Sequence, residues 1–129
     1  MLQTYAKRYG APNGYDVPAL LPQIYMHYDP YTRRNLGDGS RALVRQRMDF
    51  LLLMRDGARV VLEVDGAQHY SHDGRPSPRL YASMVSEDRQ LRLAGYEMYR
   101  FGGAELMSEE TGGPLLDDFF DRLLARHGG

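Results

Sequence analysis

The chain has 129 residues, of which 43% are hydrophobic, and its formal net charge is -1. This length and composition suit one soluble domain, and the near-neutral charge excludes a molecule-wide basic coat, so nucleic acid could bind only at a local patch. The chain has no cysteine, which excludes disulfides and thiolate metal sites and leaves oxygen or imidazole ligands for any metal.

No segment approaches the ~18 uninterrupted apolar residues that a membrane span needs. The first ten residues, MLQTYAKRYG, contain no apolar stretch of signal-peptide length. The sequence therefore predicts a cytoplasmic protein that does not bind membranes. Lys7 is the only lysine, so the basic residues are almost all arginines, whose planar groups make bidentate contacts to phosphate.

The first forty residues are rich in Tyr, Pro and Gly and have no clear periodicity. Two stretches typical of turns, APNGYDVP and YDPYTRRNLGDGS, flank a short strand predicted at 24–28. We treat 1–42 as an N-terminal extension of the single domain, whose best-defined core is 43–106.

A β-hairpin is predicted next, with strands at 44–54 and 59–66. The dipeptide Asp56-Gly57 between them is typical of a tight hairpin turn. Near the middle of both strands, successive residues are apolar, which indicates a sheet covered on both faces. The hairpin is therefore predicted to lie at the centre of the sheet.

The polar, Gly- and Pro-rich segment 71–79 is predicted to be a flexible loop. A helix is predicted at 80–94, closed by Gly95 at its C-terminal cap, with Asp88 in the middle of its apolar stripe. A third strand at 96–101 and an amphipathic helix at 114–126 complete an α/β (α+β) pattern.

Three acidic residues occur in these apolar strands. Glu63 and Asp65 share one face of a strand, with Cα atoms roughly 6.5–7 Å apart, and the hairpin turn places Asp49 near Glu63. Clustered carboxylates need a proton or a cation, and an oxygen-only ligand set suits Mg²⁺ or Mn²⁺. The alternative is that these acids are surface residues or ion-pair partners of nearby arginines, namely Arg45, Arg47 and Arg100.

His69 follows the acidic strand, where its ring could act as a general base, a general acid or a phosphate contact, or be an exposed loop histidine. Asp88 is expected to be held by Arg47 or Arg100, or else to orient His69. We favour the ion pair.

These stretches resemble the PD-(D/E)XK nuclease superfamily, which has the restriction-endonuclease-like fold. More narrowly, RMDFLLLM, VVLEVDGAQHY and SEDRQLRLAGYEMYRFGGAEL are similar to small domains akin to the very-short-patch-repair endonuclease. In that branch a strand with a lone Asp precedes a Glu-x-Asp-Gly-x-x-His strand. A helix with an Asp-Arg pair then leads into Gly-Tyr and a strand that ends in Arg-Phe. The resemblance covers 43–106.

The resemblance implies a mixed central sheet flanked by helices and an endonuclease that hydrolyses phosphodiester bonds in nucleic acid with Mg²⁺ or Mn²⁺. DNA is favoured over RNA as its substrate, and both stay open. Asp49 and Glu63 match the two metal-binding acids, and the main-chain carbonyl of Val64 matches the third ligand. Asp65 stands where the superfamily has its lysine, and we expect it to assist in metal binding and catalysis. His69 matches the histidine of the narrower branch.

Two features depart from the family: the lysine is replaced by an acid, and the N-terminal helix that often carries a further glutamate is missing. Substrate contacts are expected from Arg45, Arg47, Gln68, Arg75, Arg79 and Arg89, with Asp88 and Arg100 in supporting roles. One rival hypothesis is a nuclease-fold module that binds nucleic acid or protein without cutting. Another is an interaction domain that docks through the Tyr-rich N-terminus and the Phe119/Phe120 helix. A homodimer or a longer parent protein would fit the pattern.

Overall fold

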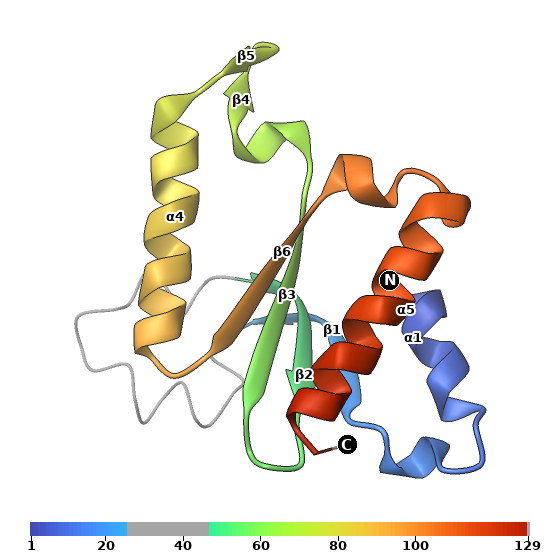
Figure 1. Ribbon diagram of the computed structural model, residues 1–129. Helices are drawn as coiled ribbons and strands as arrows, with labels where there is room; N and C mark the ends of the chain where they lie inside the picture. The colour runs from blue at the N-terminus through green and yellow to red at the C-terminus, as the bar shows by residue number, and fades with distance from the viewer. Residues whose placement is uncertain (26–46, 129) are drawn as a thin grey trace.

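The computed structural model describes residues 1–25 and 47–128. Its main sheet contains four strands in the order β1-β2-β3-β6, and their bounds are β1 (Ala19–Tyr25), β2 (Arg47–Leu53), β3 (Arg59–Asp65) and β6 (Glu97–Gly102). Neighbours among the first three are antiparallel, whereas β6 runs parallel to β3 (Figure 1). The predicted α+β class with a mixed sheet is confirmed.

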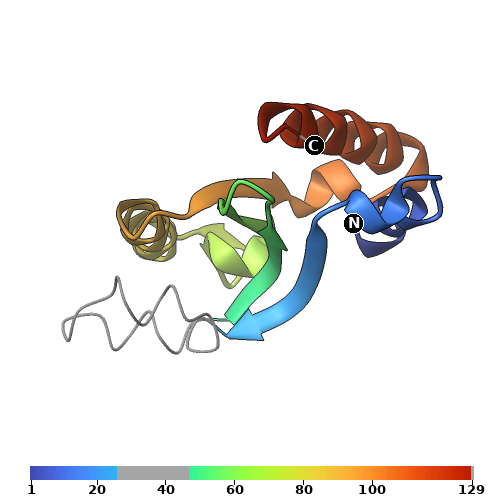
Figure 2. The same cartoon turned by 90° about the horizontal axis from the view of Figure 1, so that it is seen from below.

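Helices lie on both sides of this sheet (Figure 2). On one side, α4 (Pro78–Leu93) contributes Leu91 to a core with Met48, Leu51 and Val61. On the other side, α1 (Leu2–Tyr9) and α5 (Glu109–Arg126) form a second core over the sheet, which contains Tyr5, Leu20, Leu52, Leu62, Phe101, Leu116, Phe120 and Leu123. None of the helices within the described ranges is long and apolar enough to cross a membrane.

The β2–β3 hairpin occupies the centre of the sheet, as predicted. Its main-chain pairing runs from Phe50 opposite Leu62 to Leu53 opposite Arg59. In the turn, Asp56 Oδ1 accepts a hydrogen bond from the Ala58 N–H at 2.9 Å. Gly57 has a φ of 86°, a conformation that glycine adopts at little cost. Since both strands have a neighbour on each side and a core on each face, successive apolar residues are buried.

The N-terminal region differs from the prediction. The strand predicted at 24–28 is β1, which begins earlier, and 26–28 lie outside the described residues. The expectation that an N-terminal helix is missing is wrong because α1 precedes β1, although α1 contains no glutamate. Tyr5 anchors this short helix: its ring is fully buried and its hydroxyl donates to the Pro18 carbonyl at 2.6 Å.

The prediction of a flexible loop over 71–79 is also wrong. The segment forms a small hairpin of β4 (Ser71–His72) and β5 (Arg75–Pro76), which projects beyond the main sheet (Figure 1). Asp73 and Gly74 form its turn with φ values of 51° and 73°, which is the left-handed geometry that Asp-Gly favours in tight hairpins. The strands are too short to show a sequence period.

The remaining boundaries agree more closely. α4 begins after Ser77, whose hydroxyl accepts from the Leu80 N–H at 3.3 Å, and it ends before Gly95, as predicted. α5 begins five residues before the predicted start because Ser108 caps it by accepting from the Thr111 N–H at 3.2 Å. Short 3-10 turns complete the fold at η1 (Gly14–Asp16), η4 (Ala67–His69) and η5 (Gly103–Leu106).

The rival prediction that Phe119 and Phe120 form a docking surface is contradicted. Phe120 is 0% exposed and its ring lies 4.7 Å from that of Tyr5. Phe119 is half-buried and packs edge to face against Tyr99 and Phe101. The pair belongs to the core between α5 and the sheet.

Replacing Phe120 with alanine is therefore expected to lower the free energy of unfolding by about 3–5 kcal/mol because it leaves a cavity in this core. Leu93→Ala is a matched control, since Leu93 is 83% exposed on α4, and its effect should lie within about 0.5 kcal/mol. Urea denaturation measures both. Equal, small effects would contradict the burial of Phe120.

Candidate functional site

Asp49 and Glu63 lie side by side at the point where the main-chain pairing of β2 and β3 ends, just beyond Phe50 and Leu62. Each carboxylate bonds the backbone of the other strand. Glu63 Oε1 accepts from the Asp49 N–H at 3.3 Å, and Asp49 Oδ2 accepts from the Val64 N–H at 3.1 Å. The structure thus brings together the two acids that the sequence predicted as metal ligands.

The surroundings of this pair disfavour two ionised carboxylates. Glu63 is only 7% exposed. Burial, followed by the charge of Asp49, raises the pKa of Glu63 to about 8, although the Asp49 N–H and the guanidinium of Arg100 act in the opposite direction. Without a cation, the surroundings of Glu63 therefore favour its protonated form far more than water does. A divalent cation bound by oxygen ligands could take the place of that proton.

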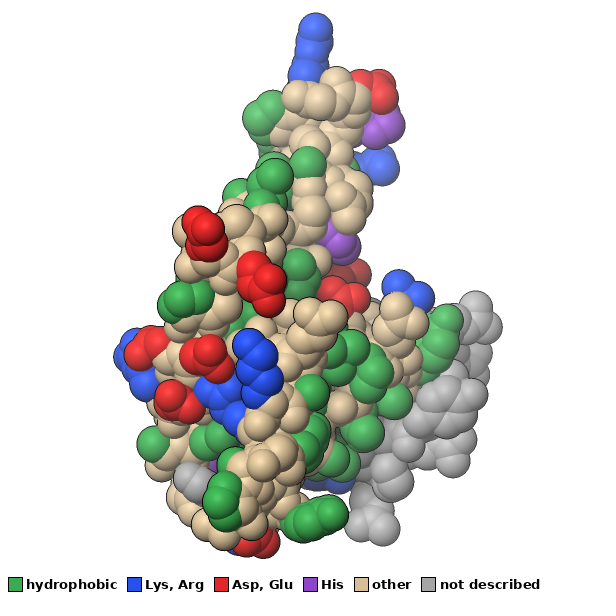
Figure 3. Space-filling model, turned by 90° about the vertical axis from the view of Figure 1, so that its right-hand side faces the viewer, with side chains coloured by type: hydrophobic (Ala, Val, Ile, Leu, Met, Phe, Trp, Pro, Cys, Tyr) green, Lys and Arg blue, Asp and Glu red, His purple; other side chains and the backbone are tan. Residues whose placement is uncertain are grey.

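The acid pair opens into a cavity of about 560 Å³ between the end of the sheet and α4. The cavity is lined by Arg47, Asp49, Glu63, Val64, Gln68, His69, Leu80, Ser83, Met84, Glu87 and Arg100. Its volume falls within the roughly 300–1,000 Å³ of typical ligand sites. In Figure 3, acidic side chains and a histidine gather in the recess beneath the projecting part of the molecule.

Asp65 does not join the acid pair, contrary to the prediction that three carboxylates converge. Its Oδ1 lies 2.7 Å from Nη1 of Arg100. The Nε of the same guanidinium lies 2.9 and 2.8 Å from the two carboxylate oxygens of Asp88. Within the described ranges, no three His, Asp or Glu side chains form a group that could hold a metal ion. The predicted ion pair between Asp88 and Arg100 is therefore confirmed, and Arg100 forms a second ion pair with Asp65.

His69 lies in η4 and lines the cavity, and its side chain is 42% exposed. Its Nδ1 is 3.9 Å from Asp65 Oδ1. Asp65, rather than Asp88, is thus the acid next to the ring. The alternative in which Asp88 orients His69 receives no support because the Asp88 carboxylate faces Arg100.

The predicted substrate contacts divide into two groups. Arg47 and Gln68 line the cavity, whereas Arg45 lies outside the described residues. The other predicted arginines are exposed and lie outside the cavity lining: Arg75 in β5, and Arg79 and Arg89 in α4.

Two lining residues on α4, Ser83 and Glu87, were not predicted from the sequence. They share a helix face with Leu80 and Met84, since the four positions are spaced by three or four residues. Helical periodicity alone could have identified them if the site had been placed against this helix.

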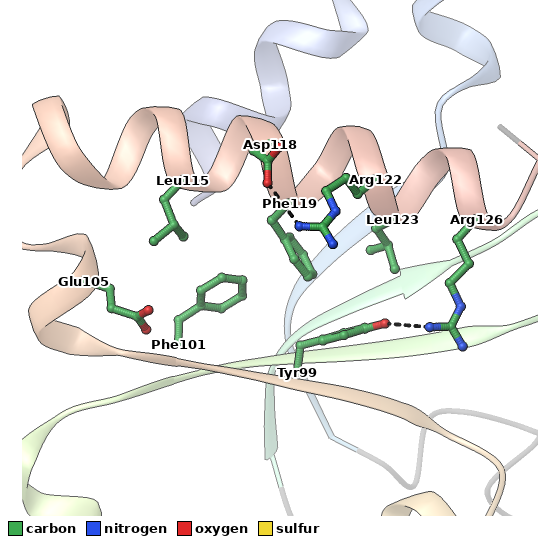
Figure 4. A pocket seen from close by; sticks show the side chains of 9 residues that line it. All are labelled: Tyr99, Phe101, Glu105, Leu115, Asp118, Phe119, Arg122, Leu123 and Arg126. Atoms are coloured by element: carbon green, nitrogen blue, oxygen red, sulfur yellow. Dashed lines mark hydrogen bonds and ion pairs between the residues drawn. The ribbon is translucent and has the colours of Figure 1, made fainter.

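A second cavity of about 420 Å³ lies on the other side of the sheet, between β6 and α5 (Figure 4). Aromatic rings of Tyr99, Phe101 and Phe119 line it. Its two acids have separate partners: Glu105 accepts from the Gly102 N–H at 2.7 Å, and Asp118 lies 3.5 Å from Arg122, which also lines the cavity. Because its acids do not face each other, we place the candidate site at Asp49 and Glu63.

No protein-family model, curated protein or solved structure matches this chain. The chain is therefore described by its own fold and site: it is an α+β protein in which buried Glu63 and half-buried Asp49 lie together at one end of the central hairpin.

The raised pKa of Glu63 predicts a pH-dependent stability. A carboxyl whose folded pKa lies above its unfolded value stabilises the fold below about pH 4.5, and this contribution is lost as the pH rises through about 8. The melting temperature of the wild type should therefore fall relative to that of Glu63→Gln between pH 5 and pH 9. The same difference between the two proteins at both pH values would contradict the assignment.

Removing the guanidinium of Arg100 should leave the carboxylates of Asp65 and Asp88 without their cation. Arg100→Ala is expected to cost about 3 kcal/mol in the free energy of unfolding, and Arg100→Lys should recover only part of this, since lysine lacks the planar fork. Arg89→Ala, at an exposed position on α4, is the control and should have little effect. Urea denaturation of the three variants tests the bridge, and full recovery by lysine would refute the bidentate contact.

Proposed function

We propose that this protein is a metal-dependent nuclease that hydrolyses phosphodiester bonds in nucleic acid, with DNA as the expected substrate. The main support is the reciprocal bonding of Asp49 and Glu63, which holds a buried and a half-buried carboxylate together at the mouth of a cavity. The resemblance of the same residues to the PD-(D/E)XK superfamily supports the same reaction.

Asp49, Glu63 and the main-chain carbonyl of Val64 would hold Mg²⁺ or Mn²⁺. These donors fit such a cation because they are all oxygens. The two acids also need positive charge beside them, since burial and mutual repulsion disfavour the ionised form of Glu63. The cavity leaves room for water and a phosphate. Bound there, a divalent cation lowers the pKa of a water and offsets the charge on phosphate oxygens.

The residues around the pair have complementary roles in this proposal. His69 takes a proton from the attacking water or gives one to the leaving oxygen, as its position between cavity and solvent allows. Arg47 lines the cavity and forms no ion pair with a described residue, so its guanidinium is available to a phosphate. Gln68 donates to phosphate or sugar oxygens.

Arg100 supplies a fixed positive charge to the site. It does so from β6, whereas the superfamily lysine would stand on β3 at the position of Asp65. Its guanidinium is held by Asp65, the residue that replaces that lysine, and it lines the cavity next to Glu63. Because an arginine remains protonated, this charge stabilises anionic oxygens and does not act as a base.

The other candidate function is binding without cleavage, as in a nuclease fold that has lost its chemistry. Replacement of the superfamily lysine favours it. The presence of the acid pair opposes it, because two adjacent carboxylates, one of them buried, cost stability unless a cation or a proton occupies the site.

The test is cleavage of single- and double-stranded DNA and RNA with Mg²⁺, with Mn²⁺ and with chelator. Metal-dependent cutting should fall at least about 100-fold in Asp49→Asn and in Glu63→Gln, since each removes one charged ligand. Glu110→Gln, an exposed acid in the first turn of α5, should cut like the wild type.

Calorimetry with Mn²⁺ accompanies the cleavage assay. Metal binding without cutting by the wild type would favour the binding module. Equal cutting by all the proteins would show that the acid pair is not the active site.

A further inference from the structure

A groove lined by two tyrosines adjoins the acidic cavity. It has a volume of about 530 Å³ and lies between the β4–β5 hairpin and the start of α4, and its lining residues are Tyr70, Pro76, Ser77, Pro78, Tyr81 and Met84. Met84 lines both spaces, and Tyr70 directly follows His69 in the chain. A ligand in the groove would therefore lie next to the acidic cavity.

The two tyrosine rings are exposed on a firmly bonded backbone. Tyr70 is 47% and Tyr81 is 56% exposed. Both are tied to Ser77: its N–H donates to the Tyr70 carbonyl at 2.7 Å, and its carbonyl accepts from the Tyr81 N–H at 3.1 Å. Pro76 and Pro78, on either side of Ser77, also restrict the backbone. The backbone that carries the two rings therefore needs little ordering when a ligand binds.

Positive charge without a partner flanks the groove. Arg75 and Arg79 are exposed, adjoin groove residues in the chain, and form no ion pair with any described residue. By contrast, five other arginines form ion pairs: Arg8, Arg55, Arg100, Arg122 and Arg126. Basic side chains stand out on the projecting part of the molecule (Figure 3). Aromatic faces beside unpaired cations suit a ligand that has both a planar ring and a phosphate, as a nucleotide does.

We infer that the tyrosine groove binds an unpaired base of a nucleic-acid strand whose backbone continues into the acidic cavity. The inference rests on the proposed function of that cavity. In a duplex, both faces of a base are covered by its neighbours, so a base can stack on a tyrosine only where it has left the stack. The substrate class is therefore single-stranded or locally unpaired nucleic acid.

The test measures binding without cleavage. Fluorescence anisotropy in chelator compares a single-stranded DNA oligonucleotide with the same sequence as a duplex. Tyr70→Ala and Tyr81→Ala should each weaken single-strand binding about 10-fold and leave duplex binding within twofold. Tyr70→Phe and Tyr81→Phe, which keep the ring, should bind like the wild type, as should Tyr15→Ala, whose ring is fully exposed elsewhere.

A 2-aminopurine base in the oligonucleotide gives a direct reading of stacking, since its fluorescence should be quenched by the wild type and not by the alanine variants. Melting curves check that each variant folds. Unchanged single-strand binding by both folded alanine variants would overturn the inference. Failure of the wild type to bind a single strand would overturn it too.

The outcomes also separate this inference from the proposed function. If the wild type cuts with metal while both alanine variants bind and cut a single strand normally, the groove inference fails and the nuclease stands. If the alanine variants lose binding while no protein cuts under any metal condition, the groove inference holds and the nuclease fails.

Discussion

Arg100 bonds two carboxylates at once, and the arrangement of the site depends on that contact. Its guanidinium joins Asp65 on β3 to Asp88 on α4 from its own position on β6, so three elements meet at one side chain. Asp65 is bonded to Arg100 and not to the acid pair, whose carboxylates accept hydrogen bonds from the main-chain N–H groups of Asp49 and Val64. A half-buried arginine with this many donors is unlike a lysine, which would offer one compact charge and leave some of these carboxylate oxygens without a donor.

The two faces of the sheet differ: one is covered by a closed apolar core, and the other carries the candidate site. Beneath α1 and α5 the core is closed by Tyr5 and Phe120, and the Arg8 guanidinium lies 5.3 Å from the ring of Phe120 while it pairs with Asp117 at 2.8 Å. This core has more buried residues than the one beneath α4. Beneath α4 the packing is firm only near Leu91, and towards the start of the helix it gives way to the acidic cavity. A cavity lined by charges is tolerated on this face because the opposite face holds the sheet and both terminal helices together.

Much of this arrangement follows from local sequence. The Asp56-Gly57 turn and the apolar runs around it determine the central hairpin, and the hairpin in turn places Asp49 against Glu63. The ion-pair partner of Asp65 cannot be predicted from local sequence in this way. Strand alternation puts it on the same face as Glu63, but its partner comes from β6, and choosing among several arginines requires the tertiary structure. The small hairpin at Ser71–Pro76 and the short α1 were missed because both are shorter than a sequence period can reveal, and α1 is fixed by Tyr5 through a bond to distant Pro18.

The parallel pairing of β3 with β6 also affects the order in which the protein assembles. The β2–β3 hairpin is local, so Asp49 and Glu63 can meet early in folding, whereas β6 can dock only after the β4–β5 hairpin and α4 have crossed back over the sheet. Non-local strand pairing of this kind is slow because the chain between the strands must close first. During that interval the acid pair lacks the nearby charge of Arg100, but it is still open to water, which screens its repulsion. The need for a proton or a cation at the pair therefore arises as α4 and β6 close over it, since burial is the main cause of the raised pKa of Glu63.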